Sequence, residues 1–152
     1  MTPRSSLDPV PTADSPRRVV ELDIPNDVRH IERVVERVQQ ACRAMAYGHR
    51  QVMLNVSVAL AEALSNAILR GNADDPSKRV HVRATIDLNR LVVEVRDEGL
   101  GFDLDACTVK VGVDTVERED GRGLFLMRNL MDRVECVSAK RGNTVRLTLN
   151  RQ

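Results

Sequence analysis

Two consecutive helical patterns, bounded by strand patterns on both sides, constrain the fold of this chain most. Between residues 27 and 45 apolar side chains recur at steps of three and four, with arginine and glutamate on the other face, which is typical of an amphipathic helix. A second helical pattern, at 49–69, has a broader apolar surface and predicts deeper burial. Residues 18–24 form a strand pattern before them, and Asn26 or Asp27 can cap the first helix.

The strand patterns after the helices come in pairs. Residues 79–87 alternate between apolar and polar, and 91–96 continue after a short turn, which predicts an antiparallel hairpin. A closing hairpin is expected from 134–138 and 144–149. Strands in hairpins with helices between them predict an α+β fold. We expect a two-layer sandwich, with a mainly antiparallel sheet of about five strands and the helices on one face.

Three further segments complete the expected domain organisation. Residues 1–17 are rich in Pro and Ser without periodicity, which predicts a disordered N-terminal tail. The polar stretch at 103–119 is long for a connection and is a candidate mobile lid. A short helix is expected at 124–131. Residues 18–152 are therefore expected to form one domain.

Composition excludes several function classes. A net charge of +1 lacks the basic excess of a duplex-binding domain, and only three aromatic residues are available to stack on single-stranded bases. No direct contact with nucleic acid is therefore expected. The sequence has no uninterrupted apolar run of 18 residues and no signal-peptide pattern, which predicts a cytoplasmic protein without a membrane span. The three cysteines lack CxxC or Cys/His spacing, which predicts reduced thiols and no zinc site.

The first candidate site segment lies on the second predicted helix. Glu62 and Asn66 are four residues apart, so they share one helix face that interrupts an otherwise apolar pattern. Buried or half-buried polar groups need partners. One reading is a partly exposed Glu and an Asn bonded to backbone. In the functional interpretation, the side-chain oxygen of Asn66 holds a Mg²⁺ ion between phosphates, and Glu62 acts as a base or orients a water molecule.

The second candidate segment directly follows the predicted strand at 91–96. Asp97 can accept a hydrogen bond from an exocyclic amine such as that of adenine, while Gly99 and Gly101 permit close approach of the backbone to a ligand. A strand that ends in a simple glycine turn is the alternative. The segment is not a dinucleotide fingerprint, because that motif opens a helix within a parallel unit.

The third candidate segment precedes the short predicted helix. Gly121 and Gly123 come just before Leu124, and glycines leading into a helix offer backbone N–H groups and the positive end of the helix dipole to phosphates. Each of the three segments is common by itself. Their occurrence in one order within one short chain is not.

Together these segments resemble the N, G1 and G2 boxes of the GHKL superfamily of ATPases, which has the Bergerat, or histidine-kinase-like, fold. The stretches AEALSNAI at 61–68, VRDEGLGFD at 95–103 and GRGLFLMRNLMDRV at 121–134 are most similar to the anti-sigma-factor serine/threonine kinases. The resemblance spans residues 18–149, nearly everything outside the tail.

The resemblance implies a binding site for ATP and Mg²⁺. Asp97 would bind the adenine amine, with Gly99 and Gly101 shaping the adenine pocket, and Thr144 matches a threonine near adenine. Asn66 would ligate Mg²⁺.

The phosphates would lie on Gly121, Gly123, Leu124 and neighbouring backbone under the lid. Glu62 matches the proposed general base, which would activate a serine or threonine hydroxyl of a partner protein. Many such kinases have His four residues after the Asn, whereas this chain has Arg70, to which we assign no role.

The resemblance also implies partners. The leading hypothesis is a kinase that sequesters a sigma factor and phosphorylates an anti-anti-sigma antagonist of the STAS type, in a homodimer. Arg29, Arg33 and Arg37 along the first helix are a candidate partner-binding surface, and an ordinary solvated face is the alternative. A second hypothesis is a nucleotide-dependent sequestration module without significant kinase activity. A histidine-kinase catalytic domain is disfavoured, because no pair of dimerising helices precedes the nucleotide domain.

Overall fold

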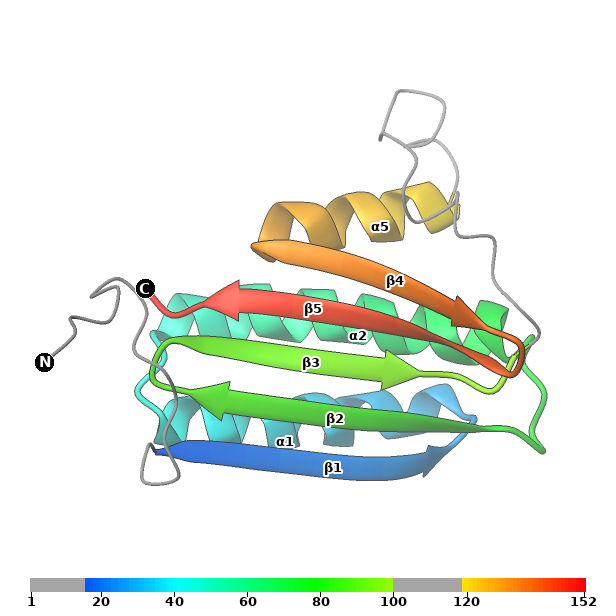
Figure 1. Cartoon of the computed structure of the whole chain (residues 1–152), viewed down its shortest axis with the longest axis horizontal. Helices are drawn as coiled ribbons and strands as arrows, with labels where there is room; N and C mark the ends of the chain where they lie inside the picture. Colours follow the sequence, from blue (N-terminus) through cyan, green and yellow to red (C-terminus); the bar gives the residue numbers. More distant parts are fainter. Residues whose placement is uncertain (1–15, 100–118) are drawn as a thin grey trace, which may run out of the picture.

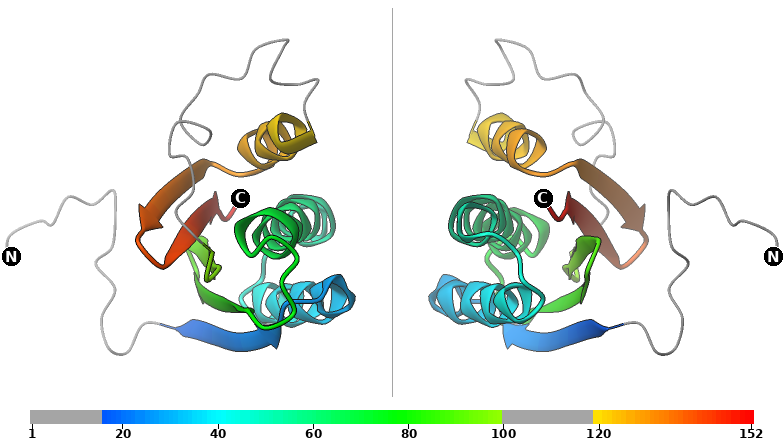
Figure 2. Two further views of the ribbon diagram at one scale, coloured as in Figure 1. Left: turned by 90° about the vertical axis from the view of Figure 1, so that its right-hand side faces the viewer. Right: turned by 90° about the vertical axis from the view of Figure 1, so that its left-hand side faces the viewer.

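The computed structural model describes residues 16–99 and 119–152, which form an antiparallel sheet with helices on one face (Figure 1). The strand order is β1-β2-β3-β5-β4, and every neighbouring pair is antiparallel. Views along the sheet show α1, α2 and α5 on the same side (Figure 2). The predicted α+β two-layer sandwich is confirmed. The strands are β1 (Arg17–Pro25), β2 (Arg79–Asp87), β3 (Arg90–Arg96), β4 (Arg133–Ala139) and β5 (Gly142–Asn150).

The helical layer begins with a 3-10 turn, Val28–His30, that leads into α1 (Ile31–Ala44). The second predicted helix contains α2 (Ser57–Asn66), flanked by π-helical turns at Gln51–Val56 and Ala67–Gly71.

Asp27 caps the first helical segment, because its Oδ1 accepts a 2.9 Å hydrogen bond from the Arg29 backbone N–H. Asn26, the alternative cap, is instead buried, and its Nδ2 donates to the carbonyl oxygens of Ile68 and Asp75.

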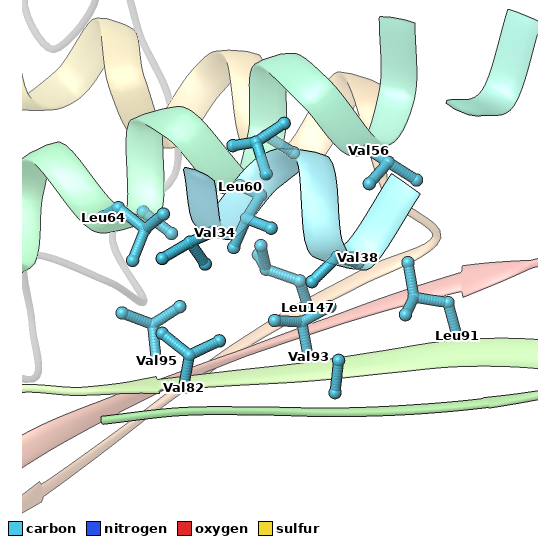
Figure 3. Close-up of a cluster of buried hydrophobic side chains, with 14 of the residues drawn as sticks. Val34, Val38, Val56, Leu60, Leu64, Val82, Leu91, Val93, Val95 and Leu147 are labelled. Carbon is cyan, nitrogen blue, oxygen red and sulfur yellow. The ribbon is translucent and has the colours of Figure 1, made fainter. Parts of the chain in front are cut away.

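An aliphatic core joins the two layers. Leu60 and Leu64 point from α2 toward Val93 and Val95 on the sheet (Figure 3). Each such side chain contributes about 1.5–3 kcal/mol on full burial. Tyr47 is the one aromatic member among the described residues, so the core is aliphatic as composition predicts.

The continuous helix Gln51–Gly71 is long and apolar enough, by composition, to cross a membrane. The predicted absence of a membrane span rested on uninterrupted apolar runs, a stricter criterion than a window average, and this helix does not contradict it. The same helix carries Leu60, Leu64 and Ile68 in the protein core. Core helices of soluble proteins also meet the criterion, so composition alone does not place this helix in a bilayer.

Helix α5 (Glu119–Leu130) starts five residues before the predicted start at Leu124, so Gly121 and Gly123 lie inside the helix and not ahead of it. The prediction placed both glycines ahead of the helix, whereas both lie within it, and Gly123 lets α5 approach the ends of the Glu62 and Asn66 side chains closely. Of the predicted lid, only Glu119 lies within the described residues, as the first residue of α5.

Other predictions lie wholly or partly outside the described part of the chain. Gly101 and residues 1–15 of the expected tail belong to this group, and Arg17 already forms part of β1. Cys42 is a buried free thiol, as expected, and burial raises its pKa to about 12. Cys136 on β4 is disulfide-bonded, so the prediction of three reduced thiols is wrong. Spacing rules detect only local cysteine motifs, and they give no information on pairing between cysteines that are distant in the sequence.

Candidate functional site

The carboxylate of Asp97 is held at the end of β3, where it is only 5% exposed. Its Oδ1 accepts three hydrogen bonds: from Gly99 N–H at 2.9 Å, from Asn143 N–H at 3.2 Å and from Asn143 Nδ2 at 3.0 Å. The Asp97 N–H in turn donates to the Asn143 carbonyl oxygen at 3.0 Å, which extends the pairing of β3 with β5. Donors on both flanking segments therefore fix the orientation of this carboxylate.

The second oxygen of Asp97, Oδ2, is the one that faces a potential ligand. Among residues 16–99 and 119–152, no donor lies within hydrogen-bond distance of Oδ2, while every fully buried side-chain nitrogen or oxygen has a partner. Oδ2 therefore has no protein donor within the described residues. A carboxylate with one oxygen satisfied by the protein and the other open is suited to accept a hydrogen bond from an amine.

Three glycines let the backbone converge on Asp97. A Cβ at position 71 would overlap Oδ2 of Asp97, one at 99 would overlap the Gly71 carbonyl oxygen, and one at 142 would overlap the Asp97 carbonyl oxygen. Gly142 also has φ +132°, which L side chains rarely adopt. Gly99 was predicted as a site residue. Gly71 and Gly142 were missed, because each was interpreted only as part of a turn.

A buried pair of asparagines ties this carboxylate end of the site to the helical layer. Asn72 is 0% exposed, and its Oδ1 accepts a 2.7 Å hydrogen bond from the Glu98 N–H. Its Nδ2 donates to Asn26 Oδ1 and to the Arg79 carbonyl oxygen, both at 2.9 Å. The end of the second helix is thus fastened to the segment that carries Asp97. Asn26 follows the first strand and Asn72 lies in a turn, so sequence analysis assigned each only a local role.

Glu62 and Asn66 come together on the exposed side of α2. Both line a hollow of about 600 Å³ with Gly123 and Leu126 of α5. Within the described residues neither side chain has a hydrogen-bond partner, although both are half-buried. The alternative in which Asn66 bonds to backbone is therefore not seen there. Half-buried polar groups without partners are typical of sites that a ligand completes.

Gly123 brings α5 close to both of these side chains. A Cβ at this position would lie 2.9 Å from Glu62 Oε2 and 3.3 Å from Asn66 Nδ2. The carboxylate and the amide therefore face one point on the surface of α5. Of the other residues predicted in this segment, Gly121 lies in α5 and Leu124 is buried in the core, so any contact of Leu124 with phosphate would involve its backbone.

Thr144 is not brought to either group. It pairs with Arg96 in the ladder between β3 and β5, and it lines a separate hollow of about 630 Å³ on the helix-free face of the sheet. Side chains alternate between the faces of a strand, so the preceding residue, Asn143, points the other way and contacts Asp97. Sequence matching selected the neighbour of the residue that makes the contact.

The candidate partner surface on the first helix shows one local ion pair. Arg29 Nη2 lies 2.6 Å from Asp27 Oδ2, and this hydrogen bond is the main cause that lowers the pKa of Asp27 to about 2. Both groups are at the surface, where such pairs contribute little to stability. The assignment of Arg29 and Arg33 to partner binding stays a prediction.

The donor set also bears on metal binding. Among residues 16–99 and 119–152, no group of three or more His, Cys, Asp or Glu side chains could hold a metal ion. The free amide of Asn66 fits a Mg²⁺ ion whose other ligands are phosphate oxygens and water, the usual arrangement for Mg²⁺ with nucleotides.

Comparison with known proteins identifies the family. The family model described as the histidine kinase-like ATPase domain matches residues 24–149. The chain therefore belongs to the histidine kinase-like ATPase family, within its group of anti-sigma-factor kinases.

Two curated relatives show the extent of the similarity. The serine-protein kinase RsbW of Bacillus subtilis is 30% identical over 135 residues, which cover 85% of this chain and 83% of the relative. The anti-sigma F factor of Oceanobacillus iheyensis is 28% identical over 99 residues, which cover 63% of this chain and 68% of the relative.

A solved structure shares the fold. The crystal structure of the RsbU and RsbW domains of a Mycobacterium tuberculosis protein matches with a TM-score of 0.63 at 15% identity. The match covers 88% of this chain and 32% of that longer one, so it supports the fold alone.

Proposed function

We propose that this protein is an ATP-dependent serine/threonine kinase that sequesters a sigma factor and phosphorylates an anti-anti-sigma antagonist of the STAS type. The observation that carries the proposal is the pairing of Glu62 and Asn66, both without partners in the described residues, opposite Gly123 in one hollow. Transfer of a phosphoryl group to a protein hydroxyl requires two groups here. One is a carboxylate that acts as the base, and the other is an amide oxygen that binds the metal ion. The names of the curated relatives support the same conclusion.

Asp97 binds the base of the nucleotide in this proposal. Its open Oδ2 accepts the hydrogen bond of the adenine 6-amino group, while Oδ1 stays on Gly99 and Asn143. Guanine has a carbonyl oxygen at the equivalent position, which would face the carboxylate without a proton between them. The site therefore selects adenine over guanine.

The phosphates lie at the other end, beside α5. Asn66 contributes an amide oxygen to Mg²⁺, which when bound neutralises charge on the phosphate oxygens. The backbone of α5 at Gly121 and Gly123 approaches the phosphates. Glu62 accepts the proton of the acceptor hydroxyl as that oxygen bonds to the γ-phosphorus, and ADP leaves with the bridging oxygen. Positioning supplies most of the rate enhancement.

The remaining features of the proposal concern assembly and location. The proposal includes a homodimer in the cytoplasm, which the family resemblance implies. Action on transcription through a sequestered sigma factor fits the name anti-sigma F factor of one relative. Arg29 and Arg33 on the exposed side of the first helical segments are the candidate partner contacts.

A phosphorylation assay tests the proposal directly. The protein is incubated with γ-labelled Mg·ATP and recombinant STAS-type antagonists, and Glu62→Gln is compared with wild type. Wild type should label one antagonist on serine or threonine, and Glu62→Gln should lose about a hundredfold or more in rate while still binding ATP. Absence of label from every antagonist, with ATP bound, would contradict kinase activity. A pull-down of candidate sigma factors with and without nucleotide tests sequestration.

A further inference from the structure

Two exposed leucines border the hollow that contains Glu62. Leu69 follows α2 and is 45% exposed, and Leu126 of α5 is 39% exposed. Glu62, Asn66 and Leu69 stand at i, i+4 and i+7, so they follow one stripe of the helix. Leu126 faces the same hollow from the neighbouring helix. Ser65 and Arg70 also line the hollow, and Arg70 already has an interaction, so the two leucines form the apolar part of the described surface beside the candidate base. We call Leu69 and Leu126 the leucine rim.

Chemistry dictates what must lie on this rim. A hydroxyl that gives its proton to Glu62 has to approach the carboxylate to about 3 Å. The residues that flank the hydroxyl in the acceptor protein then necessarily lie on the surface around Glu62. Since the hollow that holds the base is the one that the rim borders, the acceptor segment and the rim meet during the reaction. This step rests on the kinase activity proposed above.

The chemistry of the rim then indicates the chemistry of the acceptor. Leucine side chains offer no hydrogen bonds, and they gain free energy only when another apolar group removes them from water. A charged or strongly polar neighbour of the phosphoacceptor would lose water there without compensation. An apolar neighbour would bury both surfaces.

We propose that the leucine rim selects the acceptor, by binding an apolar side chain next to the phosphoacceptor hydroxyl of the antagonist. Leu69 and Leu126 are then specificity residues of the kinase: they line the hollow, but their side chains carry no group that binds phosphate or Mg²⁺. The occupant is the antagonist, and a segment of this chain outside the described residues is the competing occupant that the test must distinguish.

Kinetic constants of Leu69→Gln and Leu126→Gln test the assignment, because glutamine has a similar size and helix propensity and adds no charge beside the phosphates. Leu88→Gln is the matched control, since Leu88 is 43% exposed and lies in the turn between β2 and β3. The assay uses the antagonist that wild type labels in the phosphorylation assay. Each rim variant should raise KM for the antagonist about tenfold, the scale of one lost leucine contact. It should leave kcat and the Kd for Mg·ATP within about twofold of wild type.

A coupling measurement sharpens the result. The apolar residue next to the phosphoacceptor is changed to glutamine in the antagonist, and the cycle with Leu69→Gln is completed. The two changes should be clearly non-additive if the side chains touch.

Three outcomes would overturn the rim assignment while leaving the kinase activity intact. The rim variants could behave like Leu88→Gln, their effects could add without coupling, or the Kd for Mg·ATP could rise with the KM for the antagonist unchanged. The last result would show that the rim supports nucleotide binding and does not contact the antagonist. Failure of wild type to label any antagonist is a separate result, and it would contradict the proposed function instead.

Discussion

The two ends of the candidate site are built in opposite ways. At the base end, one oxygen of Asp97 already holds three donors, and glycine backbones surround the carboxylate. At the phosphate end, Glu62 and Asn66 have no partners in the described part of the chain. The Asp97 end is held in place without nucleotide, whereas the Glu62 and Asn66 end would be completed by phosphate and Mg²⁺ in the proposed function. Substitutions at the Asp97 end should therefore lower both stability and ATP affinity, because its packing is tight. Substitutions at the Glu62 and Asn66 end should mainly lower the rate of phosphoryl transfer.

The largest effect should come from Asp97→Ala. It removes the open acceptor for the adenine amine and leaves the three donors of Gly99 and Asn143 without their partner. We expect Mg·ATP binding to become undetectable by calorimetry, a loss of at least about a hundredfold. If the Asp97→Ala variant bound ATP with wild-type affinity, the assignment of Asp97 to adenine binding would be wrong.

Gly71→Ala tests whether the packing around Asp97 can accommodate one additional methyl group. Alanine normally stabilises a helix relative to glycine by about 1 kcal/mol. Here its Cβ would overlap Oδ2 of Asp97, so we expect the opposite sign: a lower melting temperature and an ATP affinity reduced at least about tenfold. Gly48→Ala is the control, because nothing lies within 4 Å of a Cβ there. Equal behaviour of the two variants would show that the base end is not tightly packed.

Gly123→Ala should separate activity from stability at the phosphate end. Its Cβ would meet the terminal atoms of Glu62 and Asn66, which can move aside at low cost. We expect thermal unfolding within about 1 kcal/mol of wild type and ADP binding little changed, since ADP lacks the γ-phosphate. Phosphoryl transfer to the antagonist should fall about tenfold or more, because base and metal ligand are displaced. Normal transfer would show that these side chains are not held against α5 during the reaction.

The smallest effect is expected at Asn143 and Thr144, two neighbouring residues of which only Asn143 contacts Asp97. Asn143→Ala removes one of three donors to Asp97 Oδ1 and leaves the two backbone donors, so ATP affinity should fall by about three- to tenfold. Thr144→Ala should leave it unchanged, because Thr144 lines the helix-free face of the sheet. Both affinities can be measured by calorimetry at one magnesium concentration. The reverse order of effects would favour the family resemblance over the geometry.

Much of the fold follows from periodicity, and the exceptions have physical causes. The strands at 79–87 and 91–96 appear with little change as β2 and β3, because alternation reports which face is buried. The start of α5 was missed, since Gly121 and Gly123 suggested a loop, and the contact of α5 with α2 that continues the helix through them is not visible in the sequence.

The site followed the same rule. Glu62, Asn66 and Asp97 were predicted as site residues because polar residues at regular positions of apolar elements stand out, and this assignment stays a prediction. Asn143 and Gly71 were not, because their roles depend on contacts with Asp97 that exist only after the strand and the helix end meet. Spacing locates functional groups, whereas the residues that hold those groups in place emerge from tertiary contacts.

A crystal structure with Mg²⁺ and a non-hydrolysable ATP analogue tests most directly whether both ends bind one nucleotide. We expect the adenine amine to donate a hydrogen bond to Asp97 Oδ2. We expect the γ-phosphate to lie in the hollow of Glu62, Asn66 and Gly123, with Mg²⁺ bound to the Asn66 amide oxygen. The helix-free face has a hollow of similar size, about 630 Å³ against about 600 Å³, and offers a physical alternative. Nucleotide bound there, or adenine at Asp97 with its phosphates directed away from α2, would contradict the account.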